Sequence, residues 1–325
     1  MAVSIDDVEA VRARVADVAV VTPTVPTATL SERVGTQVSL KLESIQPTGS
    51  FKVRGAASKI ASLDANTAAR GVVTASTGNH GRAVAHVARS LGIPATVCVS
   101  HNVPPGKVRA LRALGCDLAV GGHSQTDGLA AAEALVADRG MTLVHPFDDR
   151  AVIAGQGTIG VEIAEQRSDV GTVVVPLSGG GLISGVAVAV KARCPWARVI
   201  GVSMERGAVM AASLSAGHPV ELDEEPTLAD SLQGGIGTDN RYTLAITQAL
   251  VDDVVLVTEQ QIWDAMRFVL HHHRVVLEGG GAVGVAALLA GRLAAPGPVV
   301  VVASGANAED AQIAALAGAA DAPPT

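Results

Sequence analysis

The stretch GVVTASTGNHGRAVAHVA, residues 71–88, decides the fold class of this chain. It opens with a short apolar run typical of a strand buried on both faces, passes through a polar glycine loop, and ends in an alanine and valine run typical of a packed helix. α/β proteins use this order of strand, loop and helix to present backbone amides to an anion. The stretch therefore predicts an α/β fold with parallel strands.

The same alternation extends outward in both directions, which indicates a mainly parallel sheet covered by helices on both faces. Strands are predicted at 38–43, 71–75, 95–99, 117–120, 172–175, 199–202, 253–257 and 299–303. Helices are predicted at 5–18, 52–60, 83–88, 107–114, 129–137, 157–166 and 259–270. Loops with glycine beside Ser, Thr or Asn follow three of these strands, at 76–81, 178–181 and 304–307. Because such loops gather at the carboxyl ends of strands, we expect all three to face one crevice.

The composition and charge of the chain limit the kinds of molecule that it is expected to bind. The 325 residues are 48% apolar, enough for a sizeable core, and carry a formal charge of −7 without a basic cluster. Nucleic acids and anionic membranes are therefore unfavourable partners, and a small molecule is expected. Neither a signal-peptide pattern nor a long apolar run is seen, and the three cysteines have no disulfide or zinc spacing. We expect a cytoplasmic protein.

One lysine stands out in the stretch SFKVRGA, residues 50–56. A turn at 46–49 precedes it, so Lys52 is expected at the start of a helix, where the dipole disfavours the ammonium form. An amine that loses its proton readily can form a Schiff base with an aldehyde. The other four lysines have ordinary explanations on charged faces: Lys41, Lys59, Lys107 and Lys191.

Several motifs have more than one interpretation. The glycine run at 178–181 suits a phosphate cradle or a tight turn with close helix packing. His80 either orients its loop or a substrate, or is a satisfied structural histidine. The tract 271–273 places three histidines in different directions on a helix, which does not favour a shared metal ion. No nucleophile elbow, Walker A loop or dinucleotide fingerprint is present.

Five motifs in order resemble the fold-type II pyridoxal-phosphate family of threonine and serine dehydratases and serine racemase. They are residues 50–56, 76–81, 178–182, 278–282 and 304–307. The resemblance implies two three-layer lobes with mainly parallel sheets, like the tryptophan synthase β chain. It implies a large cofactor domain from residues 1–45 and 147–325, a small mobile domain from 46–146, and a homodimer.

The resemblance also implies roles for individual residues in binding pyridoxal 5'-phosphate. Lys52 bonds covalently to the cofactor, Asn79 hydrogen-bonds its phenolic oxygen, and Ser304 faces its pyridine nitrogen. Cofactor contacts are also implied for Phe51, Glu278 and the loop Ser178, Gly179, Gly180, Gly181 and Leu182. The substrate carboxylate is held by the loop Ser76, Thr77, Gly78, Asn79 and His80. Lys52 and Thr77 are the implied catalytic residues.

The reaction that the resemblance implies is β-elimination from a β-hydroxy amino acid such as L-threonine or L-serine, giving a 2-oxo acid and ammonia. Thr77 stands where serine racemases have a serine, so racemase activity is an alternative. Ser203 and Val209 replace carboxylates of a cation site, and no metal is expected. The branch that looks most similar is hydroxyectoine utilization dehydratase, which would use a larger or more acidic substrate with Arg206 or Arg241 as contacts. β-Replacement enzymes share the fold, and a silent ligand-binding protein is the non-enzymatic alternative.

Overall fold

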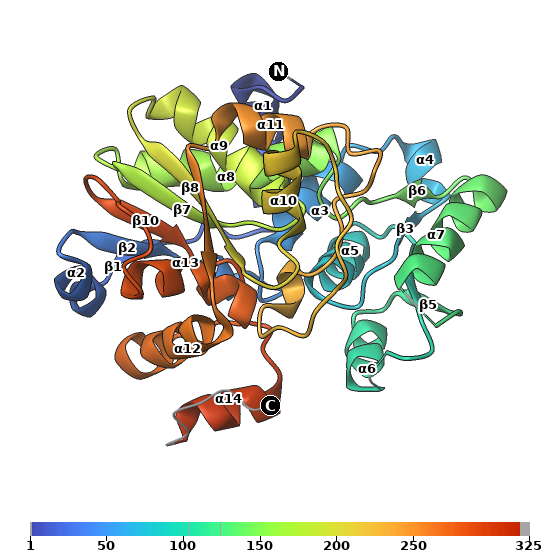
Figure 1. The fold of residues 1–325 in the computed structure, drawn as a ribbon. Helices are drawn as coiled ribbons and strands as arrows, with labels where there is room; N and C mark the ends of the chain where they lie inside the picture. Colours follow the sequence, from blue (N-terminus) through green and yellow to red (C-terminus); the bar gives the residue numbers. More distant parts are fainter. Residues whose placement is uncertain (1, 104, 124, 319–325) are drawn as a thin grey trace.

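Two sheets organise the molecule, a computed structural model that describes residues 2–103, 105–123 and 125–318 (Figure 1). All pairings between the named strands but one are parallel, and helices flank both sheets. This arrangement confirms the predicted α/β class with mainly parallel sheets. No helix within the described ranges is long and apolar enough to cross a membrane.

The larger sheet has six strands in the order β1-β2-β10-β7-β8-β9. Its strands are β1 (Thr24–Pro26), β2 (Val38–Lys41), β7 (Thr172–Pro176), β8 (Arg198–Met204), β9 (Asp253–Val257) and β10 (Val299–Val302). Every position of β2, β7 and β10 is buried, as expected for strands with helices on both faces. Figure 1 shows α8 (Arg150–Gln166) and α9 (Gly181–Arg193) on one side of this sheet and α12 (Glu259–His273) and α13 (Gly279–Leu289) on the other.

The smaller sheet has four parallel strands in the order β5-β4-β3-β6. They are β3 (Val72–Thr74), β4 (Ala95–Val99), β5 (Asp117–Val120) and β6 (Thr142–Leu143). Its helices are α5 (Asn79–Ser90), α6 (Pro105–Ala113) and α7 (Gln125–Arg139). All these strands fall within residues 46–146, the segment predicted as the small domain; its boundaries and its mobility stay a prediction.

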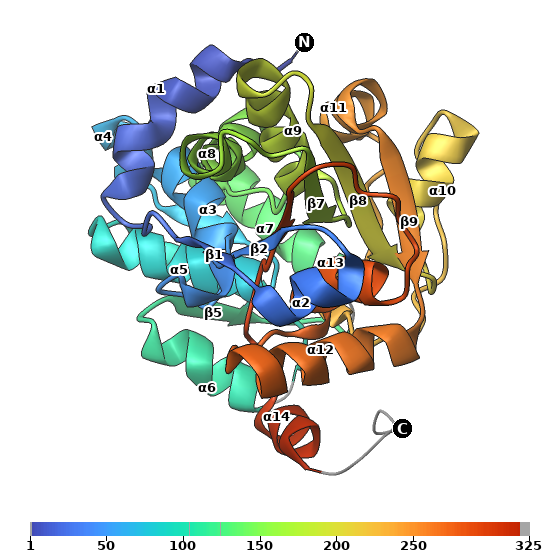
Figure 2. The same cartoon turned by 90° about the vertical axis from the view of Figure 1, so that its left-hand side faces the viewer.

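Helix α3 (Lys52–Ile60) begins at the lysine singled out from the sequence and ends where predicted. It lies between the sheets, because it packs against both α8 and α5. Figure 2 shows α1 (Ile5–Ala16), which also contacts α3 and α8, beside α8. The remaining elements are α2 (Ala28–Val34), η1 (Glu43–Ile45), α4 (Ala65–Ala69), α10 (Val209–Ala216), η2 (Asp230–Leu232), α11 (Thr243–Leu250) and α14 (Asp310–Ala317).

The predicted start of one helix needs correction. Helix α8 begins at Arg150 rather than at Gly157, because Asp149 caps it by accepting the N–H groups of residues 151 and 152. Strand β1 pairs antiparallel with β2 and was not among the strands predicted.

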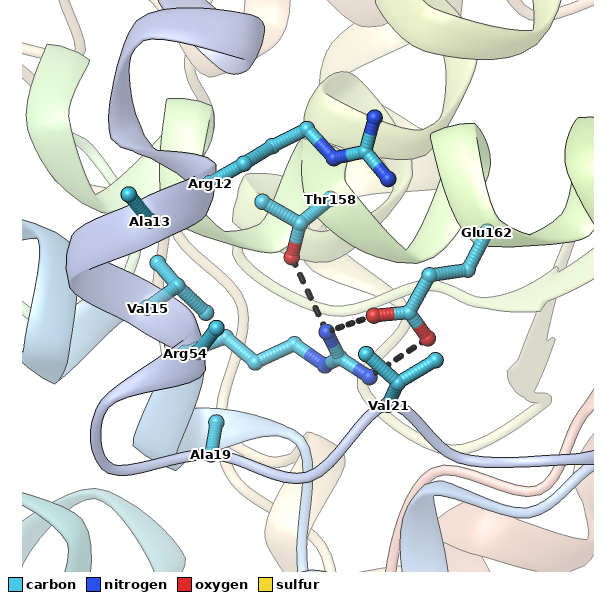
Figure 3. Close-up of a pocket in the computed structure, with 9 residues that line it drawn as sticks. Arg12, Ala13, Val15, Ala19, Val21, Arg54, Thr158 and Glu162 are labelled. Atoms are coloured by element: carbon cyan, nitrogen blue, oxygen red, sulfur yellow. Dashed lines mark hydrogen bonds and ion pairs between the residues drawn. The ribbon is translucent and has the colours of Figure 1, made fainter.

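A buried ion-pair cluster joins α3 to its neighbours. The Arg54 guanidinium donates to both Glu43 and Glu162, and Lys41 Nζ donates to Glu162 at 2.6 Å. Lys41 was expected on a charged face, but its side chain is wholly buried. It is tolerated there because it pairs with a carboxylate and donates to the Thr22 carbonyl at 2.5 Å. Arg54 and Glu162 line a cavity of about 220 Å³ beneath α1 (Figure 3).

Candidate active site

Lys52 occupies the first position of α3, after a turn that the chain closes with a hydrogen bond from Gly49 N–H to the Gln46 carbonyl. Its Nζ donates to the Pro146 carbonyl at 2.7 Å and lies 5.3 Å from the centre of the Phe51 ring. Burial lowers the Lys52 pKa to about 8, while the Glu278 carboxylate acts in the opposite direction. At neutral pH this amine is therefore deprotonated far more often than a surface lysine, as a nucleophile or base requires.

A cavity of about 1140 Å³ receives the Lys52 side chain. All residues to which the resemblance gave a catalytic, cofactor or substrate-carboxylate role line this one cavity, which brings together loops from both sheets. They are Phe51, Lys52, Ser76, Thr77, Gly78, Asn79, His80, Ser178, Gly179, Gly180, Gly181, Leu182, Glu278 and Ser304. The predicted convergence of three loops on one crevice is therefore found, while the role of each residue stays a prediction.

The glycine loop after β7 lines the cavity and leads into the start of α9. Gly180 adopts a φ of +87°, which favours glycine, and is the N-cap of α9. A Cβ on Gly179 or Gly181 would collide with Phe147, so the loop can approach this neighbour only because it lacks side chains. The first amides of a helix have no partner within the helix, and the dipole there attracts negative charge. The loop fits a phosphate group.

Glu278 and Asn79 both line the cavity and are hydrogen-bonded to each other. Asn79 begins α5 and donates from Nδ2 to Glu278 Oε1 at 2.6 Å, and Glu278 is the N-cap of α13. Burial, followed by the charge of Asp230, raises the pKa of Glu278 to about 7. This carboxyl therefore changes charge near neutral pH, next to an amide that lines the site.

Burial favours the neutral form of two histidines beside this region. His80 is buried, and its Nε2 lies 2.8 Å from the Val144 carbonyl, so Nε2 carries the proton and donates. Burial, followed by the charge of Lys52, lowers the His80 pKa to about 3. His145 Nδ1 accepts the Asp148 N–H at 2.8 Å, and burial lowers the His145 pKa as well. The structural interpretation of His80 is the one that its hydrogen bond supports.

Sequence reasoning missed residues whose partners are distant in the chain. Asp148 accepts the N–H groups of residues 241, 242 and 243 at 2.7 to 2.9 Å and so anchors the start of α11 beside the cavity. His145 and Asp148 line the cavity, but no sequence motif marked them. Arg241, considered as a substrate contact, lines the cavity, whereas Arg206 donates to the Pro226 carbonyl and is not among the lining residues of the described chain.

The site has the parts that pyridoxal 5'-phosphate needs. An aldehyde requires an amine with a lowered pKa, which Lys52 provides. A phosphate requires uncovered amides at a helix start, which the loop before α9 provides. A pyridine ring with a phenolic oxygen requires hydrogen-bonding side chains between these two points, and Asn79 and Ser304 line the same cavity. The residues present therefore fit the cofactor.

The chain is similar to known proteins over nearly its whole length. A family model described as pyridoxal-phosphate dependent enzyme matches residues 15–305. A protein of Sinorhizobium fredii named putative threonine dehydratase is 51% identical over 305 residues, which cover 94% of this chain and 92% of that protein. The L-threonine ammonia-lyase of Thermotoga maritima is 45% identical over 279 residues, which cover 86% of this chain and 69% of that protein.

Solved structures with the same fold include the maize serine racemase, with a TM-score of 0.91, 34% identity and coverage of 96% of both chains. The processed form of threonine deaminase isoform 2 from Solanum lycopersicum has a TM-score of 0.90 and 36% identity, with coverage of 96% of this chain and 86% of that one. This likeness to enzymes of the predicted family agrees with the two sheets described above.

Proposed function

Because this chain belongs to the family of pyridoxal-phosphate-dependent enzymes, we propose that it deaminates a β-hydroxy amino acid such as L-threonine or L-serine by β-elimination. The observation that carries the proposal is the Lys52 amine, which has a pKa near 8 and shares one cavity with the glycine loop before α9. The names of the relatives, threonine dehydratase and L-threonine ammonia-lyase, support this reaction class.

In this proposal the cofactor, when bound, withdraws electrons from the α-carbon of the amino acid. Lys52 would hold its aldehyde carbon, the loop at 178–182 its phosphate, and Asn79 and Ser304 its ring substituents. Once the amino group of the substrate replaces Lys52 on the aldehyde carbon, the freed Nζ of Lys52 would accept the α-proton. A nearby acid would supply the proton with which the β-hydroxyl leaves as water. Hydrolysis then returns one water, so L-threonine yields 2-oxobutanoate and ammonium.

The substrate side of the site supports two variations on this activity. Thr77 carries a hydroxyl and lines the cavity, so a racemase-like side activity is our second candidate. Exposed Arg241 lines the cavity rim, which supports a larger or acidic β-hydroxy amino acid, as in the hydroxyectoine branch. A panel of β-hydroxy amino acids of different side-chain length and charge separates these substrates.

The decisive experiment uses purified protein reconstituted with pyridoxal 5'-phosphate. We expect a visible absorbance band that borohydride removes, with the cofactor fixed on Lys52 in the peptide map. Lys52→Ala should lose the label, whereas Lys191→Met, a surface lysine paired with Asp252, should keep it. A protein that stays colourless after reconstitution would instead be a silent member of the fold.

Turnover is then measured as ammonia and 2-oxo acid released from L-threonine and L-serine without a thiol. Release from either substrate at equal amounts of both products supports the elimination. If product forms only when a thiol nucleophile is added, the enzyme catalyses β-replacement and the proposal is wrong.

We also propose a homodimer in the cytoplasm, with the small domain at residues 46–146 moving against the rest. The half-exposed side chains of Val20, Val21 and Ile45, at 48%, 59% and 52%, support burial by a second copy. The three cysteines are buried free thiols, the state that a reducing compartment maintains. Analytical ultracentrifugation of the wild type and of Val21→Asp tests the dimer, which the aspartate should weaken.

A further inference from the structure

A chain of hydrogen bonds runs from an arginine at the rim of the cavity to the buried carboxyl of Glu278. Arg82 Nη1 donates to Asn307 Oδ1 at 2.8 Å. Asn307 Nδ2 donates to Asn79 Oδ1 at 2.6 Å and to the Thr48 carbonyl at 2.9 Å. Asn79 Nδ2 then donates to Glu278 Oε1. The chain joins α5 of the smaller sheet to segments that follow β10 and precede α13.

The two ends of this chain decide which way both amides face. A guanidinium only donates hydrogen bonds, so the atom of Asn307 beside Arg82 must be its oxygen. Its nitrogen is then directed at the oxygen of Asn79 and at the Thr48 carbonyl. The Asn79 nitrogen is left facing Glu278. Turning either amide over would set oxygen against oxygen, so one orientation satisfies the whole chain.

The backbone makes room for this arrangement. Gly49 has a φ of +73°, and a Cβ at that position would lie 2.6 Å from Asn307 Oδ1. Gly49 lies between Thr48, whose carbonyl accepts from Asn307, and Ser50, which forms an isolated bridge with Gly305. The turn that precedes Lys52 is thus shaped around the Asn307 amide.

We propose that Arg82 and Asn307 are positioning residues that fix the Asn79 amide with its nitrogen toward Glu278 and the cavity. An amide nitrogen carries two hydrogens, and within the described residues one of them donates to Glu278. The second is available to an oxygen of the bound cofactor. This inference rests on the proposed function, because the oxygen it serves belongs to pyridoxal 5'-phosphate.

A merely structural role would have different consequences. If the chain only ties the two sheets together, removing it lowers stability and leaves the bound cofactor unchanged. If it orients Asn79, removing it changes the cofactor itself, since an oxygen that loses a hydrogen-bond donor holds a proton more tightly. The pH titration of the cofactor's visible absorbance therefore distinguishes the two roles, while thermal unfolding of the apoprotein reports stability.

The informative variants change polarity with little change in size. Asn307→Asp has nearly the same shape but only accepts, so it no longer donates to the oxygen of Asn79 and forces that amide to turn. Arg82→Met removes the donor at the rim, and Arg82→Lys restores one. Arg89→Met is the matched control, because Arg89 lies on the same helix and donates to the Ala113 carbonyl on an exposed surface.

We expect Asn307→Asp to raise the apparent pKa of the visible band by about one unit and to weaken cofactor binding about tenfold, the effect of one lost hydrogen bond. Arg82→Met should move both quantities in the same direction by a smaller factor, because Thr48 still restrains Asn307. Arg82→Lys and Arg89→Met should titrate as the wild type does.

If Asn307→Asp and Arg82→Met both titrate and bind the cofactor as the wild type does, the inference is wrong and the proposed function stands. The same holds for a loss of apoprotein stability without any spectral shift. A wild type that binds no cofactor would overturn both. Should Asn307→Asp fail to fold, Arg82→Met against Arg82→Lys decides alone.

Discussion

Burial of Lys52 lowers the pKa of its amine and so raises the neutral fraction at pH 7. With a pKa near 8, about one amine in ten is neutral at pH 7, against about one in three thousand for an unperturbed lysine. We therefore predict that the rate at which the apoprotein captures pyridoxal 5'-phosphate rises up to about pH 8 and then levels. Stopped-flow absorbance across pH 6 to 10.5 measures it. A rate that keeps climbing to pH 10.5 would show an ordinary lysine.

The raised pKa of Glu278 leads to a separate prediction about stability. Its pKa is raised from 4.5 to about 7, so between these values the folded protein binds a proton that the unfolded chain does not. Protonation thus favours the folded state below pH 4.5, and this advantage is lost as pH rises through 7. Relative to Glu278→Gln, the wild-type apoprotein should lose up to about 3 kcal/mol of unfolding free energy across the window. Urea unfolding at pH 4.5 to 7.5 tests this; parallel curves for the two proteins would contradict it.

At the scale of elements, the loop between β7 and α9 depends on a glycine. An alanine Cβ at Gly180 would lie 2.7 Å from Met210 Cε and 2.8 Å from Thr243 Cβ, besides the strain of a φ of +87°. We predict that Gly180→Ala costs about 2 to 4 kcal/mol and weakens cofactor binding. Gly217→Ala, at a φ of +77° with open space around it, should cost only about 1 kcal/mol and leave binding unchanged. Urea unfolding and cofactor titration of both variants separate strain from steric conflict.

Elements could be predicted from the sequence where local pattern and tertiary packing agree. Strand β9 was predicted at the residues where it lies, because apolar and β-branched residues fill it. Helix α8 was predicted too short, since Gly155 and Gly157 weaken a helix pattern. These glycines let α8 approach its neighbours: a Cβ at Gly155 would lie 2.5 Å from the Arg54 carbonyl, and one at Gly157 would lie 3.1 Å from the Gly185 carbonyl. Packing between helices overrides local propensity there, and a single sequence does not show it.

At the scale of the whole molecule, some parts of the candidate site could be predicted from the sequence and others could not. Loops at the ends of strands could be placed in one cavity, because parallel topology gathers them. The hydrogen bond between Arg82 and Asn307 could not be predicted, although both residues lie in or beside these loops, because it spans 225 residues. Asp148 likewise accepts hydrogen bonds from backbone 93 to 95 residues away. Contacts of this range depend on how the two sheets meet, which local sequence does not encode.

The buried ion-pair cluster around Arg54 joins α3 to the segment after β2 and to α8. It leads to a prediction about the stability of the whole molecule. Arg54 lies two residues after Lys52 on α3 and pairs with Glu43 beside β2. It also pairs with Glu162 on α8, as Figure 3 shows. Arg54→Met would leave two buried carboxylates with one fewer cation between them, which costs about 3 to 5 kcal/mol. Arg12, which lines the same small cavity, pairs with exposed Glu165 and partly exposed Glu9, so Arg12→Ala should cost at most about 1 kcal/mol.

Urea unfolding of the two variants at pH 7 measures the difference in their stability. The visible absorbance band of the reconstituted protein shows whether the loss of the Arg54 ion pairs also affects Lys52. Because α3 is held by this cluster at the turn that carries Lys52, Arg54→Met should also capture the cofactor more slowly than Arg12→Ala. Equal unfolding free energies would mean that water or rearranged side chains compensate the carboxylates. Normal capture with reduced stability would mean that the contacts of α3 with α5 and α8 suffice to place the lysine.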